Sequence, residues 1–139
     1  MNMQEKAELT RLLGQKKELL KKMLLLTTDI RADLEQDRIE AFADAIGLRQ
    51  QIIVQVDSLT KEEQAFRAEE DIEIMMLKKE IRGIVAQTLR QDEENTELAQ
   101  QKLEKYRDQV KKLNQSKKSV GGYTRPVGNE AAFFVDSNK

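Results

Sequence analysis

The sequence of 139 residues contains no cysteine and no histidine. Without cysteine the chain cannot form a disulfide or use a thiolate, and its composition is compatible with a reducing cytosol. Without histidine it lacks the usual general base, the commonest zinc ligand and the Glu-x-x-His pair of di-iron helical bundles. We therefore expect neither an enzyme nor a protein that holds a metal or another cofactor.

Proline and aromatic residues are also scarce, because the chain has a single proline and only 4 % aromatic residues. Charged residues make up 35 % of the sequence, and this balance is typical of long, exposed helices. No stretch of useful length alternates β-branched and polar residues, so a sheet is not expected. The composition predicts an all-α fold.

Neither sign of charge dominates, since 24 basic residues stand against 25 acidic ones and both are interspersed. A nucleic-acid-binding domain of this size would show a basic face, so a nucleic-acid partner is disfavoured. The longest apolar run covers only residues 23–26, which is far too short to span a bilayer. The first residues carry an early acid and no hydrophobic signal core. We expect a cytoplasmic protein without membrane insertion.

Apolar residues at helical spacing predict a first helix over about residues 3–34, interrupted at Lys16 and Thr27. A second apolar line runs beside the first at seven-residue steps. Together the two lines make an apolar face wider than a two-stranded coiled coil would bury, and this favours a bundle of three or four helices. The first line comprises Leu9, Leu13, Leu20, Met23, Ile30 and Leu34, and the second comprises Leu12, Leu19 and Leu26.

A capping-box pattern, Asp37 followed by Glu40, predicts the start of a second helix, with Asp37 as its N-cap. Gly47 lies inside the pattern and is expected to be tolerated there. A second capping-box pattern from Thr60 to Glu63 places the next turn at those residues. The apolar face of this helix comprises Ile39, Phe42, Ala45, Ile46, Ile52, Ile53, Val56 and Leu59.

A third helix is expected from near Glu69 to near Lys117. We interpret its first apolar residues as bundle core, including the pair Met75 and Met76. The alternative for this pair is an adaptable binding surface, since methionine repacks easily. The expected core residues are Ile72, Met75, Met76, Ile81, Ile84 and Val85.

In the third helix the helical spacing continues past Leu89, but polar residues, Asp92 and Asn95, occupy positions where the spacing calls for apolar ones. Such a helix either outruns its own core or breaks between residues 91 and 95. Asn95 could also set the register of a coiled coil. The apolar residues beyond it predict a surface for binding, and the alternative is a homodimer that buries the same stripe. These residues are Ala99, Leu103, Tyr106, Val110 and Leu113.

Acidic residues gather in two places, at residues 69–71 and 92–94. Neither group has the glycine and the spacing of a calcium-binding loop. We interpret both as solvated helix surface, and a carboxylate-only metal bundle is the enzymatic alternative.

The composition changes after Lys118, where glycine and proline become frequent. We therefore divide the chain into a helical bundle, residues 1–118, and a flexible tail, residues 119–139. Near its end the tail carries Phe133, Phe134 and Val135. Burying each phenylalanine contributes about 2–3 kcal/mol. We expect this apolar peptide to dock on its own bundle or on a partner.

Five short segments of the chain are informative when taken together: Leu-Glu-Gln-Asp-Arg-Ile-Glu-Ala-Phe at 34–42, Leu-Arg-Gln-Gln-Ile-Ile at 48–53, Asp-Ser-Leu at 57–59, Asp-Glu-Glu-Asn at 92–95 and Ala-Phe-Phe-Val-Asp at 132–136. In the third helix a basic stretch, residues 111–118, also leads to Tyr123. These features resemble bacterial flagellar export chaperones of the FlgN type, over nearly the whole chain.

The resemblance implies an antiparallel three-helix bundle or coiled coil that binds C-terminal helical segments of hook–filament junction proteins. Such a chaperone prevents premature assembly and delivers its clients to the flagellar type III export gate. The resemblance assigns gate docking to Tyr123, although its Gly-Gly context departs from the family pattern. A filament-cap chaperone and a structural coiled-coil homo-oligomer are the alternatives. The implied client-binding residues are Leu98, Leu103, Tyr106, Val110 and Leu113.

Overall fold

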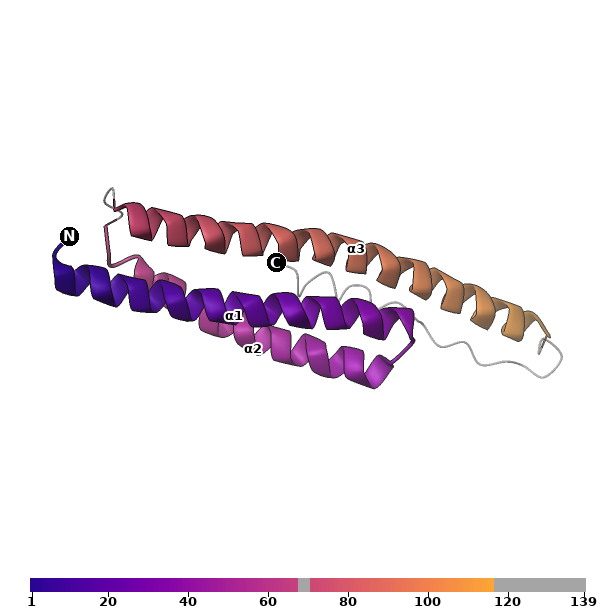
Figure 1. The fold of residues 1–139 in the computed structure, drawn as a ribbon. Helices are drawn as coiled ribbons and strands as arrows, with labels where there is room; N and C mark the ends of the chain where they lie inside the picture. The colour runs from indigo at the N-terminus through magenta and orange to yellow at the C-terminus, as the bar shows by residue number, and fades with distance from the viewer. Residues whose placement is uncertain (68–70, 117–139) are drawn as a thin grey trace. The chain divides into compact units, whose positions relative to one another are not determined.

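The computed structural model describes the backbone of residues 1–67 and 71–116, and all of its regular structure there is helical. The helices are α1 (Met3–Glu35), α2 (Ile39–Glu63) and α3 (Ile72–Ser116), as Figure 1 shows. The all-α prediction is confirmed, and so is the long third helix. With 45 residues against 33 in α1, α3 measures about 68 Å against about 50 Å.

Asp37 ends α1 and does not cap α2, so the predicted N-cap is wrong. Its φ of 56° places it in the left-handed region, one residue beyond the C-cap Gln36. The Arg38 N–H donates to the Asp33 carbonyl (2.8 Å) and the Asp37 N–H donates to the Leu34 carbonyl (3.3 Å). These two bonds form a Schellman motif, which satisfies carbonyls at the end of α1. Arg38 is the N-cap of α2 and its side chain makes no capping bond.

The turn predicted at Thr60 is also misplaced, because α2 continues to Glu63. The Thr60 hydroxyl donates to the Val56 carbonyl (2.9 Å), a bond within the helix and not a cap. The cap of α3 is Asp71, whose carboxylate accepts from the Ile74 N–H (3.1 Å). Its carbonyl accepts from the Met75 N–H (2.9 Å). Asp71, interpreted above as solvated surface, therefore caps the N-terminus of α3.

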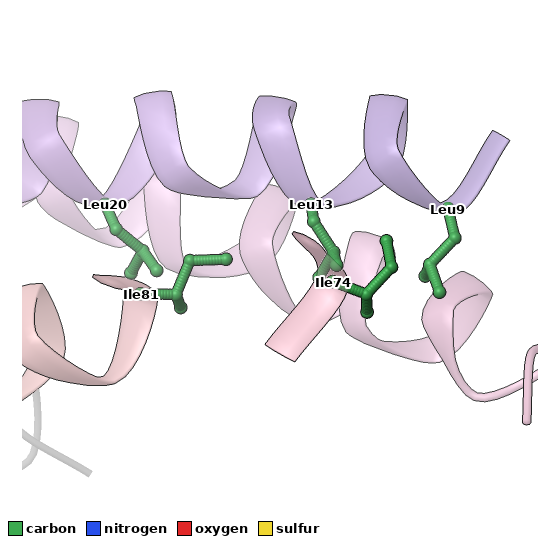
Figure 2. Close-up of a cluster of buried hydrophobic side chains, with 5 residues drawn as sticks. All are labelled: Leu9, Leu13, Leu20, Ile74 and Ile81. Atoms are coloured by element: carbon green, nitrogen blue, oxygen red, sulfur yellow. The ribbon is translucent and has the colours of Figure 1, made fainter. Parts of the chain in front are cut away.

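The chain forms two compact units, residues 1–91 and a second unit that begins at Asp92. In the first unit α1 and α2 run antiparallel (Figure 1), and buried side chains of the first part of α3 pack against α1. Figure 2 shows its core, in which α1 leucines meet α3 isoleucines. Each such side chain contributes about 1.5–3 kcal/mol on full burial. The fully buried cluster comprises Leu9, Leu13, Leu20, Ile74 and Ile81.

The two interruptions in the α1 pattern have different explanations. Lys16 donates to Glu63 of α2 (3.0 Å), and Glu63 also lies 3.9 Å from the Lys78 ammonium of α3. Thr27 is fully buried, and its hydroxyl donates to the Met23 carbonyl of its own helix (2.8 Å). Glu63 of α2 therefore links Lys16 of α1 to Lys78 of α3 at the edge of the core. Thr27, in contrast, is buried with its hydroxyl satisfied within its own helix.

The second unit is described from Asp92 to Ser116, and over this stretch α3 continues without interruption. The alternative of a helix break between residues 91 and 95 is therefore wrong. The predicted boundary at residues 118 and 119 lies outside the described residues. Within the described part of the chain, no helix combines the length and apolar character needed to cross a membrane.

Candidate binding surfaces on the third helix

The α3 backbone brings four of the five implied client-binding residues onto one face. Leu103, Tyr106, Val110 and Leu113 follow steps of three, four and three residues. At 100° per residue they share roughly 80° of the helix circumference, and we call them the client stripe. Leu98 lies roughly 60° beyond the edge of this arc, so it is peripheral to the stripe.

The client stripe is partly exposed. Tyr106 is 38 % exposed and Leu113 is 51 % exposed, while Leu103 and Val110 are half-buried. Leu98, beside the stripe, is half-buried as well. Apolar side chains that remain accessible at helical spacing are the usual basis for docking against another helix.

The opposite face of the same helical segment is polar. Gln101, Glu104 and Asp108 are exposed and lie away from the stripe, as does Gln115 about two turns further along. The segment is therefore one-sided, with apolar residues on one face and polar or charged residues on the other. The apolar area of this segment therefore lies on one face, and the other face is exposed to solvent.

The remaining predicted site residues, Tyr123, Phe133, Phe134 and Val135, lie outside the described residues. No structural role can be given to them, and the predicted gate and tail functions stay predictions.

The first half of α3 departs from the sequence prediction. Met75 and Met76 are 57 % and 60 % exposed, and Ile72 is 75 % exposed, so their assignment to the core is wrong. The core side is occupied by Ile74 and Ile81, with Leu77 between them. Three- and four-residue steps from Ile74 through Leu77 to Ile81 were the signal that could have set the correct phase.

The same phase correction applies to the start of α2. Ile39 is 69 % exposed and is not part of the core, contrary to its expected place on the apolar face. The buried apolar residues of α2 are Ala45 and Ile46, one turn and more further along. Ile39 is the first residue of α2, at the end of the helix, and lies before its buried stretch.

Charge pairs join the α1 and α3 helices at two places. Lys6 contacts Asp71 (3.0 Å) and Glu73 (3.3 Å), and Lys17 pairs with Glu80. The hydrogen bond to Asp71 is the largest reason that the pKa of Lys6 is raised. The pKa of Asp71 is lowered first by the Ile74 N–H and then by Lys6.

The pKa of Glu80 is lowered by its hydrogen bond with Lys17. These side chains sit at the surface, and their pairing explains why acids lie along this side of α3. Across residues 1–67 and 71–116, no group of three or more acidic side chains is placed to hold a metal ion.

No protein-family profile, no curated protein and no solved structure matches this chain. The site is thus characterised by its own geometry, which is a one-sided apolar stripe on a long helix. A stripe of this kind binds another helix by burying apolar area.

Proposed function

We propose that this protein is a flagellar export chaperone of the FlgN type. It acts in the cytoplasm and binds C-terminal helical segments of hook–filament junction proteins through the client stripe. It keeps these clients from assembling early and delivers them to the type III export gate. The observation that carries the proposal is the one-sided apolar stripe, which continues the phase of α3 past the core of the first unit.

The chemistry of the client stripe suits this role. A junction-protein terminus that becomes helical on assembly can complete the stripe by helix-in-groove pairing. Leu103, Val110 and Leu113 supply aliphatic area, and Tyr106 adds an aromatic side chain of the kind often found at interface hot spots. Ordering the client costs conformational entropy, so the affinity is moderate and release at the gate remains easy.

The resemblance supports the same proposal and extends it to the tail. On that basis Tyr123 docks on the export gate, and the apolar peptide at Phe133, Phe134 and Val135 docks on the bundle or on a partner.

Two alternatives use the same surface. A filament-cap chaperone would bind a different client through the client stripe, and only the choice of client separates it from our proposal. A structural coiled-coil homo-oligomer would bury the stripe against a second copy of the chain. In that case substitutions in the stripe would change the oligomeric state of the protein in the absence of a client.

The test is co-purification with C-terminal segments of hook–filament junction and filament-cap proteins, followed by size exclusion with light scattering. We expect a 1:1 complex with a junction-protein segment, and we expect Leu103→Asp to abolish it. Gln101→Asp is the matched control, because it adds the same charge on the opposite, polar face. A free chain that is dimeric at all concentrations, becomes monomeric on Leu103→Asp and binds no client would instead establish the homo-oligomer.

A further inference from the structure

A second apolar surface lies on the first part of α3, away from the core. Ile72, Met75 and Met76 are 75 %, 57 % and 60 % exposed. They line a shallow groove together with Lys78, Lys79 and Arg82. Lys78 lies 3.9 Å from Glu63 of α2, and we call the other five residues the outer α3 face. It belongs to the first unit, whereas the client stripe lies in the second.

The outer α3 face is cationic as well as apolar. Lys79 and Arg82 are exposed, and among the described residues neither forms an ion pair. The neighbouring acids of α3, Glu73 and Glu80, are instead engaged by lysines of α1. The groove therefore presents apolar side chains beside two cations with no acid of its own to neutralise them.

Gly83 adjoins this face and is not required by the packing of the bundle. A Cβ placed on Gly83 meets no atom within 4 Å, apart from the backbone of its own helix. Glycine is a poor residue for the interior of a helix, so the position carries a cost that the fold does not explain. A helix lying along the outer α3 face could approach the backbone closely at Gly83.

We propose that the outer α3 face binds an acidic amphipathic helix of a partner protein. The partner's apolar side chains cover Ile72, Met75 and Met76, which adapt readily because methionine is flexible and polarisable. Its carboxylates pair with Lys79 and Arg82, and the arginine can hold a carboxylate through two parallel hydrogen bonds. Charge complementarity selects an acidic partner over a basic one.

An anionic membrane is the less suitable occupant of this face. Helices that lie in a bilayer interface insert a broad apolar face, commonly with aromatic anchors. The outer α3 face has three apolar side chains and no aromatic one, and Ile74 and Ile81 hold the opposite side of α3 in the core. A single partner helix covers an area of this size.

The proposal is tested with the full chain and a labelled synthetic peptide of about five helical turns. The peptide carries leucines at helical spacing flanked by glutamates, and a counterpart has every glutamate replaced by lysine. Fluorescence anisotropy should show the acidic peptide binding at least about tenfold more tightly than the basic one, with weaker binding at high salt.

Two double variants then locate the binding site. Lys79→Glu with Arg82→Glu should weaken binding of the acidic peptide by at least about tenfold. Arg11→Glu with Lys61→Glu makes the same change in net charge at exposed positions on α1 and α2, and should leave binding unchanged. Replacing both Met75 and Met76 by glutamine should weaken binding without changing the helical circular dichroism signal, since both side chains are exposed.

Three results would overturn the proposal. One is equal binding of the acidic peptide by the two charge-reversed double variants. Another is that the protein binds the acidic and basic peptides equally well but binds vesicles of phosphatidylcholine and phosphatidylglycerol, and that only the Lys79→Glu, Arg82→Glu variant loses this vesicle binding. The third is a dimer of the free chain that this same variant dissociates, because a second copy would then occupy the face.

Discussion

Leu13 provides the most direct test of how the first unit is held together. It is 1 % exposed and belongs to the cluster in which α1 meets α3. Leu13→Ala removes buried apolar atoms and leaves a cavity in that cluster, which should lower the free energy of unfolding by about 3 kcal/mol. Leu25 is the matched control, because it lies in the same helix but is 66 % exposed.

Leu25→Ala should change the free energy of unfolding by less than about 0.5 kcal/mol. Both substitutions make the same change in helix propensity, so the difference between them reports burial alone. The measurement is urea unfolding followed by circular dichroism at equilibrium. If Leu13→Ala prevents folding, Ile81→Val in the same cluster should still fold and cost about 1 kcal/mol. Equal losses for the two leucine variants would refute this account of the core.

Two further predictions concern the helix ends. Asp37 has a left-handed backbone, so Asp37→Gly should be more stable than Asp37→Ala by about 1 kcal/mol in urea unfolding, although both lose the same side chain; an equal or more stable alanine variant would argue against the Schellman motif. Asp71 has a lowered pKa, so its carboxylate contributes stability above its unfolded pKa, and this contribution is lost as the pH falls through the folded value. Asp71→Asn keeps a capping oxygen but loses the charge. Its free energy of unfolding should therefore be lower than that of wild type at neutral pH, and the two should become equal in acid. A difference that does not change with pH would contradict the role assigned to the charge.

The helices themselves follow from the sequence, because long apolar lines at helical spacing specify both their number and their approximate ends. The predicted first helix ended at residue 34 and α1 ends at Glu35, while the predicted third helix and α3 end within one residue of each other. Leu9, Leu13 and Leu20 are in the core as expected. A periodicity of this length determines the class of fold strongly.

The turn between α1 and α2, and the choice of which face of α3 is buried, were predicted less well from the sequence. Asp37 fits a capping box, but it also tolerates the left-handed backbone that a Schellman motif needs, and the end of α1 uses it for that purpose. The steps from Ile74 through Leu77 to Ile81 were one signal for the phase of α3, but Met75 and Met76 form a competing apolar line beside it. The rotation of α3 against α1 decides between the two lines, and this rotation is a property of the packed structure.

Buried polar residues were the other feature that the apolar pattern could not reveal. Arg49 is 3 % exposed and Thr88 is 1 % exposed, although neither residue type is common in a core. The Thr88 hydroxyl donates to the Ile84 carbonyl of its own helix (2.8 Å). A threonine that satisfies its hydroxyl locally can occupy a core position, and the sequence does not show where this happens.

The central claim is that the client stripe binds a helix, and it is tested most directly by titrating a labelled C-terminal segment of a hook–filament junction protein. Leu103→Asp should weaken its binding by about 2 kcal/mol or more, which is roughly 30-fold, while Gln101→Asp should match wild type. Wild-type affinity in the Leu103→Asp variant, with its fold intact by circular dichroism, would contradict the account.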